Sequence, residues 1–270
     1  LYERDCTIQR RHQKLLEEAP SPSLTQRQRT RLGYLAIKAC KAMGYTNAGT
    51  VEFLMDGQGN FYFMEINARI QVEHPVTEVI TGVDLVREQI RIAYGEKLSY
   101  RQSDIKINGH AIECRINAED SEADFVPCTG TITDLILPGG NGVRVDTAIK
   151  TGTDVTPYYD SMLAKIIVHG KDRDSAIRKM STALAEMKIS GIKTTISFFR
   201  KLLLNEDFRT SNYTTKFLET YRTDEEQEGV HFDAAAIISA LYSKRQKDMR
   251  SFSTKNGTRS STTGTNKWGM

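Results

Sequence analysis

The residues best suited to chemistry lie at every second position between Glu65 and Glu73. The sequence there reads EINARIQVE, so that Glu65, Asn67, Arg69, Gln71 and Glu73 alternate with apolar residues. Because side chains two positions apart in a β-strand share a face, this period predicts one wholly polar face. A surface strand of a half-exposed sheet would alternate in the same way. Such strands usually expose Thr, Lys and Ser, however, so this row of acids, amides and a cation favours a metal and anion site.

A second acid, Glu52, is expected to face this row across a turn. The segment DGQGN at 56–60 lies between two strand-like runs, which predicts a β-hairpin. With a loop of about four residues, Asp56 lies opposite Phe61 and Glu52 lies opposite Glu65. Cross-strand neighbours sit about 4.5 to 5.5 Å apart at Cβ, and like charges so placed are destabilising unless something positive lies between them.

A divalent cation would relieve that repulsion. Asn67 lies two residues past Glu65 and offers a third hard oxygen beside Glu65 and Glu52. Such donors suit Mg²⁺ or Mn²⁺, which keep several waters and complete their shell with nucleotide phosphates. The pattern therefore predicts a site for a metal-nucleotide complex.

The elements that must position these residues follow from the periodicity of the sequence. An alternating pattern over 6–17 predicts a strand on which His12 and Lys14 share a face. A helix over 25–43 is expected to pack with Cys40 in the core, and it stops at a glycine. The other predicted elements are hairpin strands 50–55 and 61–67, helices ending at Val79 and over 84–94, strands 109–117, 131–137, 143–146 and 163–169, and helices 173–187 and 194–204. Together they predict an α+β fold, a mixed sheet with helices.

Composition excludes several classes of function. The 270 residues, 39% hydrophobic and 26% charged, predict about two globular domains. The net charge of +3 is slight and Lys and Arg are scattered, so no nucleic acid partner is expected. No apolar run reaches the roughly 18 residues that span a membrane, so no membrane association is expected. The four cysteines lack zinc or disulfide spacing, which indicates reduced thiols in the cytoplasm, or in an organelle matrix.

Four stretches resemble the biotin carboxylases, members of the ATP-grasp superfamily. They are DCTIQRRHQKLLEEAP at 5–20, FMEINARIQVEHPVTEVITGVDLV at 63–86, GHAIECRINAED at 109–120 and PYYDSMLAKIIVHG at 157–170. The resemblance covers residue 1 to about 221 and implies the following division. An incomplete ATP-grasp domain spans 1–96, a linker 97–108, a biotin carboxylase C-terminal domain 109–221, and a helical and disordered tail 222–270, with a helix over 233–246.

The resemblance implies a ligase that uses ATP and bicarbonate to carboxylate biotin on a carrier protein through carboxyphosphate. The roles it assigns are metal ligands Glu52, Glu65 and Asn67; ATP-binding His12, Glu52 and Glu65; bicarbonate-binding Lys14, Arg69, Gln71 and the backbone of Val72; biotin-binding Arg115; and catalytic Glu73, Arg69 and Arg115. Glu73 would be the general base for bicarbonate. Arg115 would stabilise the enolate-like oxygen that develops on biotin. Without the resemblance, an ordinary ion pair would be the better interpretation of this arginine.

The resemblance also implies partners: a biotin carboxyl carrier protein or domain, carboxyltransferase subunits, and a second copy in a homodimer of the full-length protein. The final acceptor, acetyl-CoA in fatty acid biosynthesis or another acyl-CoA or keto acid, stays open. The family's N-terminal domain and glycine-rich lid have no counterpart in this sequence, so we expect a fragment that is inactive alone. The alternatives are another carboxyphosphate-forming ATP-grasp ligase and a non-catalytic chain.

Two other residues have alternative interpretations. Asp160 either orients Arg115 or caps a turn. The segment around Lys188 resembles the turn on which carrier domains attach biotin, but Lys188 is expected at the end of helix 173–187. A carrier function is therefore disfavoured.

Overall fold

The computed structural model describes residues 1–221, which form one compact unit. The predicted helix over 233–246 and the predicted disordered tail lie outside the described residues. Within residues 1–221, helices and sheets occur together, which confirms the predicted α+β class. The predicted mixed sheet is wrong, because every strand pairing among these residues is antiparallel.

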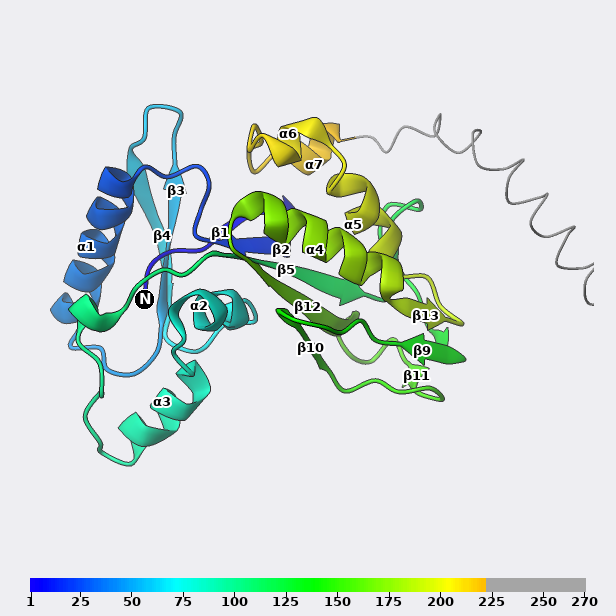
Figure 1. Ribbon diagram of the computed structural model, residues 1–270, viewed down its shortest axis with the longest axis horizontal. Coiled ribbons are helices and arrows are strands. Elements are labelled where there is room, and N and C mark those ends of the chain that lie inside the picture. The colour runs from blue at the N-terminus through cyan, green and yellow to red at the C-terminus, as the bar shows by residue number, and fades with distance from the viewer. Residues whose placement is uncertain (222–270) are drawn as a thin grey trace, which may run out of the picture. The chain divides into compact units, whose positions relative to one another are not determined.

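A five-stranded antiparallel sheet lies at the centre of the unit (Figure 1). In spatial order its strands are β1 (Asp5–Arg10), β2 (Gln13–Ala19), β5 (His110–Asn117), β12 (Met162–Gly170) and β10 (Val143–Thr147). The pairing of β2 with β5 joins the two sides of the expected linker, which contains η1 (Gln102–Asp104) and no strand. The two expected domains therefore share one sheet.

Helices cover the two faces of this sheet. α4 (Arg173–Glu186) packs on one face, over a large core that includes Cys114. α2 (His74–Thr81) packs on the other, where Ile80 and Ile167 belong to a smaller core. Because successive residues of a strand point to opposite faces, β5 and β12 each supply apolar side chains to both cores, with the larger share under α4.

The predicted hairpin is confirmed. β3 (Thr50–Met55) pairs antiparallel with β4 (Phe61–Asn67), and Glu52 lies opposite Glu65. The two acids are thus cross-strand neighbours, as the sequence predicts.

The predicted end of the hairpin loop is wrong, because Met55 rather than Asp56 lies opposite Phe61. A bulge next to Glu52 places one extra residue in β4. This extra residue offsets the one-residue error in the loop, so that Glu52 still lies opposite Glu65. The acid pair therefore forms although the loop was placed one residue off.

The polar row does not continue as a strand. β4 ends at Asn67, and residues 68–73 have no regular structure before α2 begins. The prediction of one polar face is therefore wrong beyond Asn67, since Arg69 is exposed whereas Gln71 and Glu73 are buried.

The strand predicted over 6–17 is two strands, β1 and β2. They turn at Arg11 and His12, whose φ angles are 49° and 65°. Such positive values are uncommon outside glycine and mark a tight turn. The prediction that His12 and Lys14 share a strand face is therefore wrong, because only Lys14 lies in a strand.

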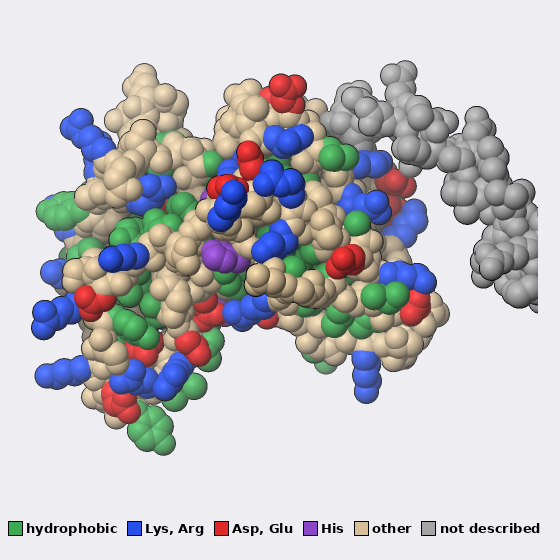
Figure 2. All heavy atoms as spheres, viewed as in Figure 1, with side chains coloured by type: hydrophobic (Ala, Val, Ile, Leu, Met, Phe, Trp, Pro, Cys, Tyr) green, Lys and Arg blue, Asp and Glu red, His purple; other side chains and the backbone are tan. Residues whose placement is uncertain are grey.

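α1 (Gln26–Ala42) begins where predicted, with Thr25 as a capping residue that accepts a hydrogen bond from the backbone N–H of Gln28 at 3.3 Å. No residue of α1 is buried, so the predicted core position of Cys40 is wrong. Hydrophobic side chains gather over α1 and the hairpin in the space-filling view (Figure 2). The exposed ones there are Tyr34, Ile37, Met43, Leu54, Met55, Tyr62, Phe63 and Met64.

The remaining elements are short. They are α3 (Leu85–Ala93), β6 (Glu119–Asp120), β7 (Val126–Pro127), β8 (Gly130–Thr131), β9 (Asp134–Ile136), β11 (Asp154–Val155), β13 (Lys188–Ser190), α5 (Ile196–Leu202), α6 (Glu206–Arg209) and α7 (Phe217–Thr220). The strand predicted over 131–137 is therefore interrupted between β8 and β9. Among the helices within residues 1–221, none combines the length and the hydrophobicity needed to cross a membrane.

A buried acid on the α4 face, Glu18, ties three segments together. His110 Nε2 and Arg173 Nε each lie 2.7 Å from its Oε2, and Tyr213 Oη donates to its Oε1 at 2.6 Å. Burial raises the pKa of Glu18, but the hydrogen bonds from His110 and Arg173 and their charges outweigh burial, so the pKa lies below its usual value. The ionised carboxylate therefore stabilises the packing of α4 on the sheet.

We expect Glu18→Gln to destabilise the chain most near neutral pH. A lowered folded-state pKa means that the charge contributes stability above the usual value of 4.5, and that this contribution is lost as pH falls through the folded-state pKa. Urea unfolding from about pH 7 to about pH 3 should show a difference between the two proteins that shrinks with falling pH. The exposed Glu122→Gln serves as the control, and a difference independent of pH would contradict the role of the charge.

Candidate functional site

Glu73 lies at the centre of the candidate site, at the residue that precedes α2. Its side chain is 3% exposed. Oε1 accepts a hydrogen bond from Lys14 Nζ at 2.8 Å, and Oε2 accepts one from Arg115 Nη2 at 3.0 Å. Lys14 lies in β2 and Arg115 in the neighbouring β5, so the sheet brings together three predicted site residues that are far apart in sequence.

The surroundings of Glu73 keep it ionised. Burial raises the pKa of Glu73, but the hydrogen bond from Lys14 and the charges of Arg4 and Lys14 outweigh burial and lower it. For Lys14, burial lowers the pKa, yet Cys6, Glu52 and Glu73 raise it above its usual value. The ionised carboxylate is the form that can accept a proton, as a general base must.

Glu52 connects this centre to the hairpin. Its Oε1 accepts three hydrogen bonds: from Lys14 Nζ at 2.8 Å, from Gln71 Nε2 at 2.6 Å and from Asn67 Nδ2 at 3.1 Å. Lys14 thus bridges Glu52 and Glu73. The candidate metal ligand and the candidate base share one ammonium group.

The amide of Asn67 bridges the two facing acids. Its Nδ2 donates to Glu52 at 3.1 Å and to Glu65 at 2.8 Å. In the structure the Asn67 amide lies between the two carboxylates, and the Lys14 ammonium adds positive charge on the Glu52 side.

The same three groups fit a magnesium or manganese ion. Glu52, Glu65 and Asn67 offer hard oxygen atoms, since a half-turn of the amide would present Oδ1 in place of Nδ2. Within residues 1–221, no group of three or more His, Cys, Asp or Glu side chains could hold a metal ion. Two carboxylates and an amide match the sparse protein ligand set of a metal bound through nucleotide phosphates.

Two predicted residues, Arg69 and His12, are exposed, and a third, Val72, lies between Gln71 and Glu73 of the cluster. The exposed Arg69 donates from Nη1 to the backbone oxygen of Ile70 at 3.2 Å. His12 is exposed in the turn between β1 and β2. The backbone oxygen of Val72 accepts a hydrogen bond from Lys165 Nζ at 2.6 Å. Among the described residues, the structure shows no bond from His12 or Arg69 to another predicted site residue.

Sequence reasoning missed Arg4. Its Nη2 donates to Gln71 Oε1 at 2.7 Å and to Thr50 Oγ1 at 2.9 Å, and its Nη1 donates to Thr77 Oγ1 at 3.1 Å. Arg4 therefore fixes the amide of Gln71, whose other end binds Glu52. No local pattern marks this arginine, because its partners lie in distant segments.

Sequence reasoning also missed Lys165, for which a signal exists. This lysine interrupts the apolar run LAKIIV of β12 and is buried. A buried lysine requires a partner. Lys165 Nζ donates a hydrogen bond to the Val72 backbone oxygen at 2.6 Å, and it lies 3.6 Å from Asp146 and 3.9 Å from Glu113.

The structure distinguishes between the alternative interpretations of Asp160 and of Lys188. Asp160 caps a turn, because its Oδ1 accepts the backbone N–H of Met162 at 2.9 Å. Lys188 begins β13 rather than ending a helix, and it pairs with Asp134 at 2.5 Å.

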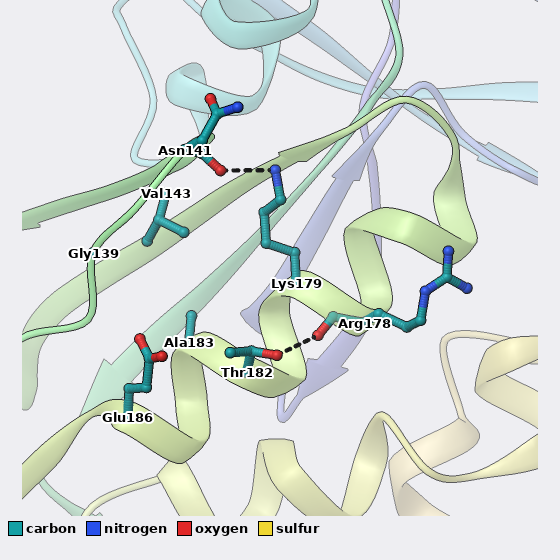
Figure 3. A pocket seen from close by; sticks show the side chains of 8 residues that line it. All are labelled: Gly139, Asn141, Val143, Arg178, Lys179, Thr182, Ala183 and Glu186. Carbon is teal, nitrogen blue, oxygen red and sulfur yellow. Dashed lines mark hydrogen bonds between the residues drawn. The ribbon is translucent and has the colours of Figure 1, made fainter.

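A cavity of about 280 Å³ lies elsewhere, between α4 and the loop before β10 (Figure 3). Lys179 lines it together with Gly139, Asn141 and Arg178. The Lys179 ammonium is already bonded to the backbone oxygens of Asn141 at 2.8 Å and His169 at 2.6 Å. None of the predicted site residues lines this cavity, so it is not the candidate site.

Comparison with known proteins divides the chain into two matched parts. Residues 113–220 match the family described as biotin carboxylase C-terminal domain. Residues 1–101 match the family described as carbamoyl-phosphate synthase L chain, ATP binding domain. Both matches lie within the compact unit.

Similar proteins span more sequence than this chain. Biotin carboxylase 1 of Bacillus subtilis is 57% identical over 222 residues, which is 82% of this chain but 49% of that protein. The biotin carboxylase of a Nostoc species is 54% identical over 219 residues, 81% of this chain and 49% of that protein. A solved biotin carboxylase domain of a thermophilic 2-oxoglutarate carboxylase, bound to bicarbonate, is 54% identical with a TM-score of 0.79, covering 81% of this chain and 49% of that one. The chain thus spans about half the length of the curated relatives it matches.

We expect Lys14→Ala to destabilise the chain, because Glu52 and Glu73 both lose their shared ammonium. The free energy of unfolding should fall by about 2 kcal/mol, the cost of leaving partly buried charges unpaired. Urea unfolding at neutral pH measures it. Lys193→Ala, which removes an exposed pair with Asp120, is the control and should leave the midpoint nearly unchanged. An equal effect of the two substitutions would contradict the bridging role of Lys14.

Proposed function

Because this chain belongs, through residues 1–220, to the biotin carboxylase family, we propose that it supplies the bicarbonate-activating and biotin-facing part of a biotin carboxylase. The proposed reaction is the ATP- and bicarbonate-dependent carboxylation of N1′ of biotin on a carrier protein. One observation carries the proposal: Glu73 is a buried, ionised carboxylate held between Lys14 and Arg115. A base and two fixed cations at one point are what the activation of a small oxyanion requires.

Binding of bicarbonate is assigned to the cations and amide around Glu73. Lys14 and Gln71 already converge on Glu52 from two directions. Arg69 can grip two oxygens at once with its planar guanidinium, and the backbone N–H of Val72 adds one donor. Because Arg69 is exposed, this role requires it to turn toward the anion.

The first chemical step joins bicarbonate to the γ-phosphoryl group of ATP. Glu73 takes the bicarbonate proton, the oxygen so activated forms a bond to the γ-phosphorus, and the bond from phosphorus to ADP breaks. A Mg²⁺ or Mn²⁺ ion bound with the nucleotide by Glu52, Glu65 and Asn67 would neutralise charge on the phosphates. His12 is assigned to the nucleotide.

The second step transfers the carboxyl group. Carboxyphosphate breaks into CO₂ and phosphate, phosphate takes the N1′ proton of biotin, and N1′ bonds to CO₂. Arg115 stabilises the oxyanion that develops on biotin, and it needs no reorganisation because Glu73 and β5 fix its place.

The partners follow from the same proposal. They are a biotin carboxyl carrier protein or domain, carboxyltransferase subunits and, for the full-length protein, a second copy. The free cysteines, Cys6, Cys40, Cys114 and Cys128, favour the cytoplasm or an organelle matrix as the location. The domain division at 96 and 109 is likewise proposed.

A second candidate is a carbamoyl-phosphate synthetase or another ligase that forms carboxyphosphate. The match of residues 1–101 to an ATP-binding domain of that name favours it. Biotin-stimulated ATP cleavage separates the two candidates, because only a biotin carboxylase responds to biotin.

We expect Glu73→Gln to lower bicarbonate-dependent ATP cleavage by about 10² to 10⁴, the usual contribution of a general base. The assay uses the intact enzyme, which is this chain together with the remaining length of its relatives, supplied where necessary from Biotin carboxylase 1 of Bacillus subtilis. Nucleotide affinity should change little. Glu78→Gln, within α2, is the matched control, and near-normal turnover of Glu73→Gln would remove Glu73 from this role.

We expect Glu65→Ala to weaken binding of the magnesium-nucleotide complex by about tenfold or more, the usual effect of disturbing a metal site. Isothermal titration of the intact enzyme with MgADP measures the change. Tyr62→Phe, on the same strand and exposed, is the control. Unchanged affinity in Glu65→Ala would show that the metal assignment is wrong.

A further inference from the structure

Glu17, a buried acid in β2, binds Arg115 beside the candidate site. Arg115 Nε donates to Glu17 Oε1 at 2.7 Å, and Nη2 of the same arginine also contacts this carboxylate. The Glu17 side chain is fully buried, with 0% exposure. The proposed function uses Arg115 but assigns nothing to Glu17.

The sheet register determines this contact. Glu17 lies opposite Glu113 on β5, and Arg115 lies opposite Lys165 on β12, all within the central strands. Because β2 is hydrogen-bonded on both edges, to β1 and to β5, the Glu17 backbone cannot shift without breaking the sheet. Glu17 therefore offers Arg115 a fixed anchor.

The hydrogen bonds of Arg115 leave one part of its guanidinium available. Nε and Nη2 contact Glu17, and Nη2 also donates to Glu73. Within residues 1–221, Nη1 has no hydrogen-bond partner. An arginine held by one edge presents its remaining N–H groups in a fixed direction, which suits a developing oxyanion.

Glu17 in turn depends on Arg115. Its second oxygen, Oε2, is buried without a hydrogen-bond partner within residues 1–221. Burial raises the pKa of Glu17 to about 7, and the charge of Arg115 opposes this rise. A carboxylate placed only for stability would have more partners, as its neighbour Glu18 has on the opposite face.

We propose that Glu17 is a positioning residue for the biotin-carboxylation step: its fixed carboxylate holds the Arg115 guanidinium so that Nη1 points at the oxyanion of biotin. This inference rests on the proposed function of Arg115. It extends that function to a residue that does not touch the substrate.

The test measures two properties of the intact enzyme: the rate of biotin-dependent carboxylation and the affinity for MgADP. Glu17→Gln keeps the shape of the side chain and removes the charge. Biotin-dependent carboxylation should fall by about tenfold or more, as expected when a partner that orients an active-site group is lost. The affinity for MgADP should change by less than about twofold, because Glu17 does not contact the hairpin acids.

A double-mutant cycle separates positioning from general stability. If Glu17 acts through Arg115, Glu17→Gln should add little further loss in the Arg115→Ala background. Glu18→Gln, one residue along the same strand and equally buried, is the matched control. It should lower stability but leave the biotin KM unchanged, and its effect should be additive with Arg115→Ala.

Each outcome has a distinct meaning. Full biotin-dependent activity in Glu17→Gln, or additive losses in the cycle, would overturn the inference while leaving the function intact. Full activity in Arg115→Ala itself would overturn the proposed function. If Glu17→Gln does not fold, Glu17→Met removes the charge without burying an unsatisfied amide and should give the same loss.

Discussion

The site depends on one buried carboxylate being held between two cations. Glu73 lies where α2 begins, and it would be costly to bury there as an anion without Lys14 and Arg115. These cations belong to β2 and β5, so the carboxylate joins the helix to the sheet. The same contacts keep Glu73 ionised and place positive charge beside it, which is why stability and chemistry cannot be separated here.

The central sheet separates two kinds of buried charge. On the α4 face, Glu18 has hydrogen bonds from His110, Arg173 and Tyr213, and its role is to hold segments together. On the α2 face, Glu17 is left with an oxygen that has no partner among the described residues. Adjacent residues of β2 thus point to opposite faces. Both oxygens of Glu18 accept hydrogen bonds, whereas Glu17, beside the candidate site, has one oxygen without a partner among the described residues.

The hairpin acids show how local pattern and tertiary contact combine. Their cross-strand pairing follows from turn chemistry, and a bulge compensates for the misplaced loop end. What makes the pair tolerable is an amide from the same hairpin, Asn67, and an ammonium from β2, Lys14. To bind a metal-nucleotide complex, the Asn67 amide would turn so that its oxygen faces the metal. The metal would then supply positive charge where the amide nitrogen now contacts Glu52 and Glu65.

The sequence alone determined the hairpin and the facing acids, which depend on one short segment. It also determined the α+β class and the family motifs, because each predicted element and each motif is itself a local pattern. Tertiary structure decided the rest. The alternation through Arg69 predicted one continuous face, but the strand ends at Asn67 and only Gln71 and Glu73 turn inward. The contacts of Arg4 with Gln71 and of Glu17 with Arg115 join residues 67 and 98 positions apart, so no local period could reveal them.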